Sequence, residues 1–483
     1  MSESRILASE PREAVAGARY DLEADVVVVG LGIAGACAAI EAAAAGAEVL
    51  VLERAGGGGG TSAQSGGVIY LGGGTPVQRS CGFDDDPDEM FRFLMAASGP
   101  EPDESKTRLF CDESVAHFHW LEQQGVPFKH SFYPEPSMEA PTDDCLVFTG
   151  GEDTWPYNEI ARPAARGHKP RAPAAAGGFL MQRLIEALGR LPARIECDVL
   201  AETLVVERDG AVVGLVARRA GEELSVRARR GVVLTSGGFV LDDEMVAHHC
   251  PQVAKCEWRL SAGGDDGRGI RMGIGAGGEA IRMDAIECAI PLTPPRRLVR
   301  GALVNRFGQR FINEDTYYGR IGQTSLFRQD GAMFFIHDAD TYEVNDAGFE
   351  VSWVGETIEE LEREMALPEG SLQATIELYN RHAERGEDPV FHKGREFLKP
   401  LTAPPFGAID CSSGEVLYAT FTLGGLHTRP GGEVLTPDGR EVPGLYAAGR
   451  TTSGLAAFGY VSGISLADGS FFGRLAGRSA AER

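Results

Sequence analysis

The sequence predicts an α/β protein, and three observations support this prediction. First, a β-branched run at residues 26–29 leads into a glycine motif, an Ala-rich stretch and a second apolar run at 49–52. Second, residues 195–217 alternate in polarity and contain the turn dipeptide Asp209-Gly210. Third, residues 287–419 lack glycine-rich strand ends and carry polar helical patterns. We therefore expect a Rossmann-like α/β domain with a β-meander, into which an α+β cap domain is inserted.

The junction between the first strand and the first helix carries glycines in the spacing G-x-G-x-x-G. Gly30 lets the chain turn sharply, Gly32 lets the backbone approach a diphosphate, and Gly35 lets the helix lie close to the strand. The Ala-rich helix expected at 36–45 directs its free N–H groups and half-positive dipole end toward that diphosphate. This arrangement predicts a dinucleotide site.

Glu53 strengthens that prediction. It follows the second strand, 49–52, where a carboxylate can accept hydrogen bonds from a ribose diol. A glycine-rich turn without a ligand would leave this acid without a role. The motif does not by itself distinguish FAD from NAD.

Composition limits the classes of function. The chain of 483 residues has 46 Lys and Arg against 70 Asp and Glu, a net charge of −24, which argues against nucleic acid and anionic membrane surfaces as partners. Residues 1–23 lack the apolar core of a secretory signal, and the apolar run 26–40 is too short to span a bilayer. Nine cysteines without C-x-x-C or metal-ligand spacing indicate free thiols in a reducing cytoplasm and no metal site.

Two further stretches are candidates for ligand contact. Residues 54–67 are too rich in glycine for a helix or a strand and carry several hydroxyls. They form either a backbone cradle along a pyrophosphate, ribityl chain and ring, or a flexible surface loop. A glycine–acid turn at 264–267 leads into an expected helix, and its Asp265 or Asp266 either holds a flavin group or caps that helix.

Polar and apolar periodicity predicts the remaining helices. We expect helices at 86–97 and 103–124, followed by an irregular excursion at 133–178. Within the cap, helices are expected at 357–366 and 371–386.

The strands near the ligand are expected to end in small residues. The meander has a third strand at 224–228, and a separate buried strand begins at Gly231. Another strand ends at Gly449, where small side chains suit a flat ring. The last helix, about 463–477, can direct its N-terminus at a flavin pyrimidine, where reduction places negative charge.

Six motifs together resemble those of the fumarate reductase/3-ketosteroid dehydrogenase flavoprotein family. They lie at 29–35, 61–67, 264–267, 303–314, 423–426 and 444–449. The resemblance covers roughly residues 22–478 and is weak at 127–178.

The resemblance implies an FAD-binding domain in two parts, 21–286 and 420–483, a cap or substrate domain at 287–419, and a site between flavin and cap. It also implies which residues bind FAD. They are Gly30, Gly32, Ile33, Ala34, Gly35, Glu53, Arg54, Ala55, Thr61, Ser62, Ser65, Gly66, Gly67, Val199, Ser236, Gly237, Asp266, Gly449, Arg450, Gly463, Ser465 and Leu466.

Three positions depart from the family pattern. Fumarate reductases have two arginines and a histidine where this chain has Tyr318, Tyr460 and Phe421. A dicarboxylate needs paired guanidinium groups, which these side chains cannot supply. The departures imply a neutral, largely apolar substrate. The loop 61–70 also lacks the histidine that some relatives use to link flavin covalently, so FAD is expected to be bound non-covalently.

Within the family, residues 456–469 look most like the 3-ketosteroid Δ4-(5α)-dehydrogenases. That likeness implies a C4–C5 double bond introduced into a 3-keto-5α-steroid, with a base removing the C4 proton and a hydride passing from C5 to flavin N5. We expect Tyr460 to be the base, with Ser462 hydrogen-bonded to its oxygen, and Tyr318 to be the proton relay or second acid.

Several alternatives stay open. Tyr318 can be a packing residue, and Ser462 a helix N-cap. Within the family, a 3-ketosteroid Δ1-dehydrogenase or a reductase of an enone or unsaturated acid is possible. From another class, a flavin sensor or electron-transfer subunit without turnover is possible. The sequence does not give the electron acceptor, the steroid side chain or the oligomeric state.

Overall fold

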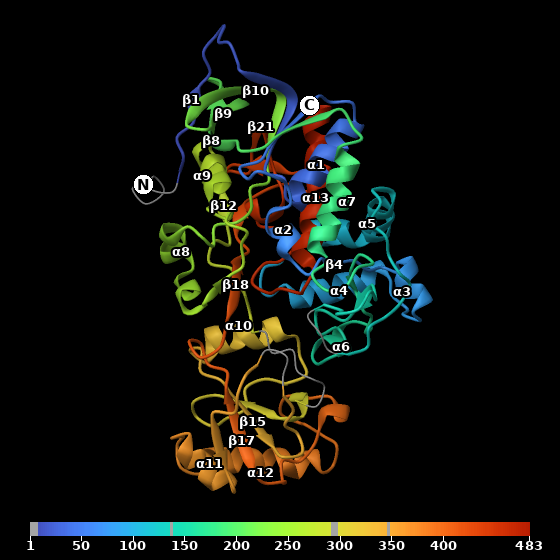
Figure 1. The fold of residues 1–483 in the computed structure, drawn as a ribbon, viewed down its shortest axis with the longest axis vertical. Helices are drawn as coiled ribbons and strands as arrows, with labels where there is room; N and C mark the ends of the chain where they lie inside the picture. The colour runs from blue at the N-terminus through green and yellow to red at the C-terminus, as the bar shows by residue number, and fades with distance from the viewer. Residues whose placement is uncertain (1–7, 136–138, 291–297, 345–347) are drawn as a thin grey trace.

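A nine-stranded sheet lies at the centre of the larger part of the molecule, in the upper half of Figure 1. The computed structural model describes residues 8–135, 139–290, 298–344 and 348–483. The strands run in the order β1-β8-β9-β10-β2-β3-β7, and β21, paired with β20, joins β10. Their bounds are β1 Arg12–Glu13, β2 Leu22–Val29, β3 Val49–Leu52, β7 Ala193–Glu196, β8 Leu200–Val206, β9 Val212–Arg219, β10 Glu222–Leu234, β20 Glu433–Leu435 and β21 Glu441–Ala447. Parallel pairing of β2 with β3 and β10 agrees with the predicted α/β fold class.

Strand β10 corrects one expectation. The third meander strand and the strand beginning at Gly231 are one continuous element, not two. Its first half pairs antiparallel with β9 and its second half pairs parallel with β21. The register against β2 shifts between Ala228 and Gly231, so the intervening arginines, which look like a break in sequence, are an irregularity within one strand.

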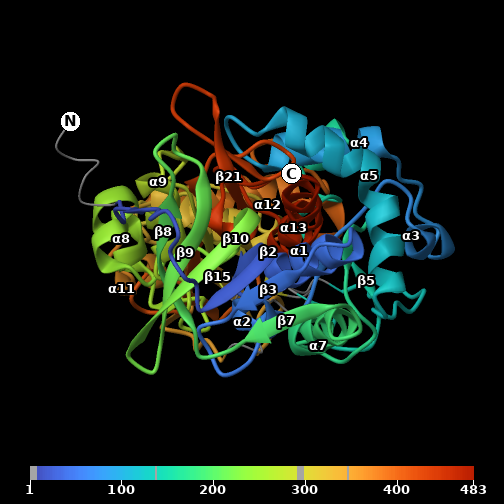
Figure 2. The same ribbon diagram turned by 90° about the horizontal axis from the view of Figure 1, so that it is seen from above.

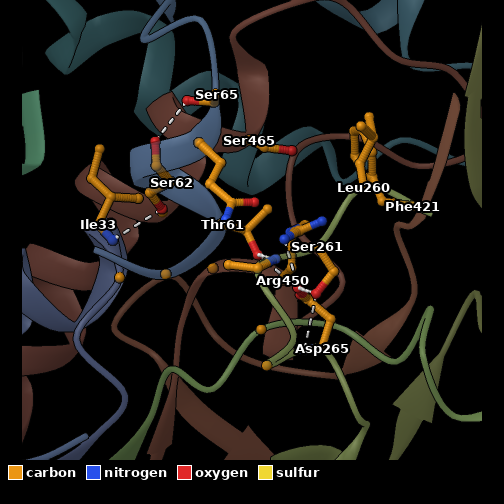
Figure 3. Close-up of a pocket in the computed structure, with 18 of the residues that line it drawn as sticks. Ile33, Thr61, Ser62, Ser65, Leu260, Ser261, Asp265, Phe421, Arg450 and Ser465 are labelled. Carbon is orange, nitrogen blue, oxygen red and sulfur yellow. Dashed lines mark hydrogen bonds and ion pairs between the residues drawn. The ribbon is translucent and has the colours of Figure 1, made fainter. Parts of the chain in front are cut away.

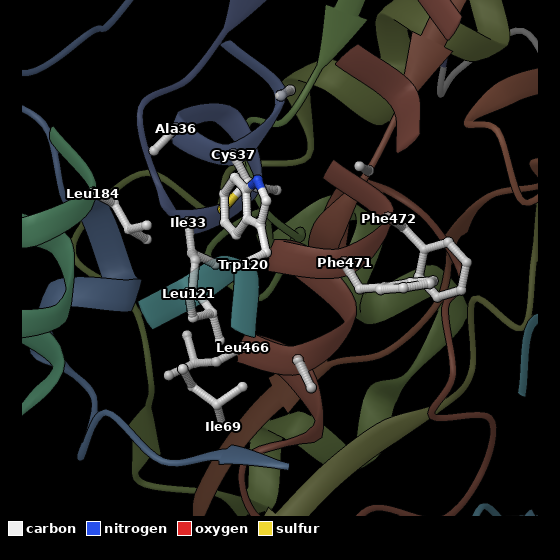
Figure 4. Packing of buried hydrophobic residues seen from close by; sticks show 14 of the residues in the cluster. Ile33, Ala36, Cys37, Ile69, Trp120, Leu121, Leu184, Leu466, Phe471 and Phe472 are labelled. Carbon is white, nitrogen blue, oxygen red and sulfur yellow. The ribbon is translucent and has the colours of Figure 1, made fainter. Parts of the chain in front are cut away.

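Three helices lie side by side against this sheet (Figures 1 and 2): α1 Ile33–Ala44, α7 Gly177–Leu188 and α13 Ile464–Glu482. Helix α1 begins three residues before the expected position. The backbones of α1 and α13 meet closely, because a Cβ added at Gly477 would lie 2.0 Å from the Ala38 carbonyl oxygen. Figure 4 shows the apolar side chains of this region, including Ile33, Leu466 and Phe471, gathered in one buried cluster.

A helical region flanks the three helices. It contains α3 Pro76–Ser80, α4 Pro87–Ala97, α5 Glu104–Gln123 and α6 Tyr157–Ile160, with a small sheet of β4 Ile69–Tyr70, β6 Gly167–His168 and β5 Leu146–Val147. The helices expected at 86–97 and 103–124 are confirmed. The glycine-rich stretch was wrongly expected to lack helix, since α2 occupies Gly60–Gln64.

A separate four-stranded sheet forms the lower part of the molecule in Figure 1. It has the order β14-β15-β17-β16, with bounds Ala302–Val304, Phe334–Asp338, Phe406–Asp410 and Trp353–Gly355. Helices α11 Ile358–Glu364 and α12 Ser371–Ala383 pack against it around their own apolar cluster. Helix α10, Tyr318–Arg328, lies between the two parts.

Two paired strands carry the chain into and out of this lower part. Strand β13, Ile286–Ala289, runs antiparallel to β18, Ala419–Thr422, and β18 also pairs with β11, Trp258–Arg259. The remaining described elements are α8 Asp243–His249, α9 Arg268–Gly275, β12 Ala280–Ile281, β19 Gly425–Leu426, and the 3-10 helices η1 Pro251–Lys255, η2 Leu298–Arg300, η3 Arg395–Phe397 and η4 Gly449–Thr451.

Among the helices in the described part of the chain, none combines the length and apolarity needed to cross a membrane.

Candidate active site

One long cavity of about 530 Å³ runs from the glycine motif to the tyrosines. Its wall combines α1, the 54–67 stretch, the turn before α9, β13, the start of α10 and the start of α13. Figure 3 shows its central part. Every residue predicted to bind FAD or to act on substrate lines this cavity, with the exception of Gly35.

Gly35 supports the turn rather than the cavity wall. A Cβ at this position would lie 1.9 Å from the Gly30 carbonyl oxygen, so the helix can approach the strand only with glycine here. Gly30 has a φ of +100°, and a Cβ there would lie 2.7 Å from the Thr235 oxygen. A Cβ at Gly32, in contrast, would meet only the Ser62 Oγ at 3.5 Å. The Gly32 backbone is therefore open to a ligand.

Glu53 is fixed in position at the same end. One carboxylate oxygen accepts a hydrogen bond from the Leu31 backbone N–H at 2.8 Å, and the other accepts one from the Ala55 N–H at 2.8 Å. The side chain is buried, with 7% of its surface exposed. Its remaining acceptor positions can bind hydroxyl groups.

Asp265 organises the middle of the cavity. The sequence left its role open between holding a flavin group and capping a helix, and the predicted FAD-binding set included only its neighbour Asp266. Figure 3 shows the side chains directed toward it. Its carboxylate accepts hydrogen bonds from the Thr61 hydroxyl at 2.7 Å, the Ser261 hydroxyl at 2.5 Å and Arg450 Nη2 at 2.9 Å. Burial alone would raise the pKa of Asp265, but the Arg450 guanidinium and these hydrogen bonds hold it below its usual value.

Asp266 has a different role from its neighbour. Its Oδ2 pairs with Arg54 Nη1 at 2.8 Å, and its Oδ1 accepts a hydrogen bond from the Arg268 backbone N–H at 3.2 Å. The N-cap position of α9 belongs to Gly267. Both acids line the cavity, and Asp265 is the more deeply buried of the two.

Aromatic side chains form the far end of the cavity. Tyr318 is the first residue of α10 and Tyr317 is its N-cap, and their ring centres lie 4.4 Å apart. Tyr460 meets the Phe421 ring edge to face at 5.2 Å. The Arg450 guanidinium lies 5.1 Å from the centre of the Phe421 ring, but it is already paired with Asp265. The described wall therefore offers phenols here and no pair of free guanidinium groups.

The two phenols predicted to be functional have different hydroxyl partners. Burial raises the pKa of Tyr318, and hydrogen bonds with Ser462 and Tyr317 oppose that increase. Burial raises the pKa of Tyr460 to about 12, opposed by a hydrogen bond with Ser465.

This pairing corrects the expectation that Ser462 contacts Tyr460. Gly463, with a φ of +94°, turns the chain into α13. Ser465, in the first turn of that helix, is therefore the serine that reaches Tyr460. Ser462 precedes the turn and meets Tyr318.

Glu287 is a further residue that the sequence-based prediction missed. It lies on β13 and is 1% exposed. The Tyr317 hydroxyl and the Gln323 side-chain amide donate to its two oxygens, each at 3.3 Å. Burial raises the pKa of Glu287 to about 8. The sequence feature that could have identified it is a single acid inside the apolar run 285–290.

Two known proteins are similar to this chain over most of its length. A 3-oxo-5-alpha-steroid 4-dehydrogenase of Comamonas testosteroni is 29% identical, over 88% of this chain and 92% of that protein. The structure of 3-ketosteroid-Δ4-(5α)-dehydrogenase from Rhodococcus jostii RHA1, in complex with 4-androstene-3,17-dione, has a TM-score of 0.94 and 49% identity, covering 98% of this chain and 100% of that one.

A third protein shares the fold. The 3-ketosteroid Δ1-dehydrogenase from Sterolibacterium denitrificans has a TM-score of 0.72 and 21% identity, covering 95% of this chain and 99% of that one. The FAD binding domain family matches residues 25–466, which include nearly all of the cavity wall described above. The chain therefore belongs to the FAD binding domain family.

Proposed function

We propose that this protein is an FAD-dependent dehydrogenase that introduces a C4–C5 double bond into 3-keto-5α-steroids. The observation that carries the proposal is the far end of the cavity, where Tyr318, Tyr460 and Phe421 replace the charged groups that a dicarboxylate would need. The 49% identity to a Δ4-(5α)-dehydrogenase holding a 4-ene-3-ketone supports it.

The cavity fits FAD at its other end. The open backbone at Gly32 and the N-terminus of α1 suit a diphosphate, and Glu53 suits a ribose. We propose that FAD is held there non-covalently by the cavity-lining residues named above. When bound, it supplies the group that accepts a hydride. In this proposal, segments 21–286 and 420–483 hold the cofactor and segment 287–419 closes over the substrate.

Tyr460 and Tyr318 have different roles toward the substrate ketone in this proposal. A tyrosine with a pKa of about 12 stays protonated at neutral pH, so Tyr460 is suited to donate a hydrogen bond to the C3 oxygen. That bond strengthens as negative charge develops on the oxygen and acidifies the C4 proton. The base role first expected for Tyr460 would require a tyrosinate, which burial disfavours.

The pair of Ser462 and Tyr318 is then the acceptor for the C4 proton. Both side chains line the far end of the cavity, and Ser462 lowers the pKa of Tyr318 against the effect of burial, so a proton taken by one hydroxyl can be passed to the other. A steroid filling this end would displace water, which would strengthen these polar contacts.

The proposal is tested by anaerobic titration of the purified yellow protein with 5α-androstane-3,17-dione. We expect the flavin absorbance to bleach and 4-androstene-3,17-dione to form. A 1-ene product would support Δ1-dehydrogenation instead. A flavin that stays oxidised with this steroid would remove the proposal and favour a sensor or a reductase of another acceptor.

A further inference from the structure

We propose that Glu287 is the terminal acceptor for the substrate proton, reached from Ser462 and Tyr318 through the hydroxyl of Tyr317. This inference rests on the proposed function. Glu287 does not need to touch the substrate, so it acts as a positioning residue that holds the proton at the end of a relay.

The proximity of the four groups supports the relay. Ser462, Tyr318, Tyr317 and Glu287 line one cavity, and the ring centres of Tyr317 and Tyr318 lie 4.4 Å apart. The Tyr317 hydroxyl lies 3.3 Å from Glu287 Oε1. The Tyr317 side chain is 6% exposed, so the path runs inside the protein. The start of the path and the carboxylate both line the same cavity.

The surrounding structure holds the carboxylate in this position. The Gln323 amide donates to the Ile286 carbonyl at 2.9 Å and to Glu287 Oε2 at 3.3 Å, which fixes the second oxygen. A Cβ at Gly319 would lie 2.3 Å from Glu287 Oε1 and 2.4 Å from the Tyr317 ring. Glycine at that position is what allows the first turn of α10 to bring phenol and acid together.

Among the described residues, the surroundings of Glu287 offer partners but no neutralising charge. The titratable side chains near it are Tyr317 at the N-cap of α10, Tyr318 in its first turn and Tyr460 from the segment before α13, while Cys288 follows it on its own strand. Strand β18 contributes no titratable side chain. A buried acid without a paired cation favours its neutral form, so Glu287 gains stability when it takes up a proton.

The relay explains how phenols that resist ionisation can still move a proton. As the C4–H bond breaks, Ser462 accepts that proton and passes its own to Tyr318, which passes its own to Tyr317 and so to Glu287. Each hydroxyl gains and loses one proton, so no tyrosinate forms. For the proton, the C4–H bond breaks and one carboxyl O–H bond forms. The C4–H electron pair becomes the new C4–C5 double bond, and the C5–H electron pair leaves with the hydride.

The relay makes a prediction about pH. Glu287 can accept a proton only when it is ionised, so the rate of flavin reduction is expected to rise with pH through about 8. In Glu287→Gln, which keeps the hydrogen-bonding shape but cannot be protonated, this rise is lost. We expect reduction at saturating steroid to be slower by roughly tenfold or more at about pH 9, with little change at acidic pH and little change in KM.

The experiment measures single-turnover reduction by 5α-androstane-3,17-dione against pH in wild type, Glu287→Gln and Glu152→Gln. Glu152 is a matched control, because it is also buried with a raised pKa of about 7 but does not line the cavity. Its variant is expected to keep the wild-type profile. Infrared difference spectra at about pH 9 should show a newly protonated carboxyl on reduction of wild type, absent in Glu287→Gln.

The outcomes separate the two proposals. Failure of the steroid to reduce the wild-type protein would remove the proposed function and the relay with it. Reduction of wild type with the same profile and infrared band in Glu287→Gln would remove the relay alone. Should Glu287→Gln fail to fold, Tyr317→Phe decides, since it breaks the path while keeping the ring. A wild-type profile in that variant would also overturn the relay.

Discussion

Asp265 and Glu287 are two buried carboxylic acids in the wall of one cavity, and their surroundings are opposite. Asp265 has a guanidinium partner and several hydrogen-bond donors, which keep its pKa below the usual value. Glu287 has a phenol and an amide as partners, and burial raises its pKa to about 8. The comparison shows that the middle of the cavity holds an acid paired with a cation, whereas the phenol end holds an acid whose charge is disfavoured, as the proposed relay requires.

The largest effect is expected from Tyr460→Phe, at the phenol end. Removing the hydroxyl that we propose to stabilise the developing oxyanion should slow flavin reduction by about 10²–10³-fold. Flavin content and the visible spectrum should stay as in wild type, because the nucleotide end is untouched. Stopped-flow absorbance measures both. Full activity in this variant would contradict the division between the two ends.

Ser462 and Tyr318 are expected to behave as one unit. Ser462→Ala and Tyr318→Phe should each slow reduction by roughly 10²-fold, and the double variant should be little slower than either. A double-mutant cycle on the reduction rate gives the coupling. Losses that simply multiply would mean that the two hydroxyls act independently, contrary to the proposed proton transfer between them.

Substitutions at two glycines should distinguish a residue that supports the turn from a residue that contacts the cofactor. Gly35→Ala places a Cβ 1.9 Å from the Gly30 oxygen and should destabilise the fold by about 1–3 kcal/mol. Gly32→Ala has room in the protein, so stability without cofactor should change by less than about 1 kcal/mol, while FAD affinity falls by about tenfold or more. Denaturant unfolding and flavin titration measure the two quantities.

The matched control for that pair is Gly57→Ala, since a Cβ at Gly57 meets nothing within 4 Å. It should leave stability and affinity unchanged. Equal effects of Gly32→Ala and Gly35→Ala on both quantities would contradict the separate roles.

The smallest effects concern stability against pH, and the two acids should act in opposite directions. Glu287 has a raised folded pKa, so wild type loses stability as pH rises from about 4.3 through about 8. The Glu287→Gln variant has no such loss. The difference between its Tm and that of wild type should therefore increase by a few degrees in favour of the variant as pH rises across that range.

Asp265 has a lowered folded pKa, so its contribution is present above the unfolded pKa of about 3.9 and is lost as pH falls through the folded value. Asp265→Asn should therefore lower the Tm at neutral pH, with a deficit that shrinks in acid. Thermal melts from acidic to alkaline pH test both variants. If the Tm differences of the two variants from wild type changed with pH in the same direction, the proposed contrast between the two acids would be contradicted.

The end of the cavity near the glycine motif could be predicted from sequence because its residues are close together in the chain. Gly30, Gly32 and Glu53 lie within a single strand–helix–strand unit, where spacing fixes their positions. The short helix α2 could not be predicted, since its glycines disfavour helix. A contact supports it instead: Ser62 accepts a hydrogen bond from the Ile33 N–H at 3.2 Å.

The phenol end resisted prediction because its partners come from distant segments. Resemblance located Tyr318 and Tyr460, but the choice of serine partner depended on the turn at Gly463. Glu287 and Tyr317 come together only because β13 and α10 pack. The sequence pattern around each of them is that of an ordinary buried element.

The register of the two connecting strands has a consequence for protein engineering. Glu287 on β13 lies opposite Phe421 on β18, so both strands that lead to the lower sheet carry part of the cavity wall. A chimaera that exchanges the lower module between relatives should therefore be joined after Ala289 and before Ala419. Junctions placed inside this ladder would replace Glu287 or Phe421 with the relative's residue, and the hybrid would differ in the cavity wall as well as in the lower module.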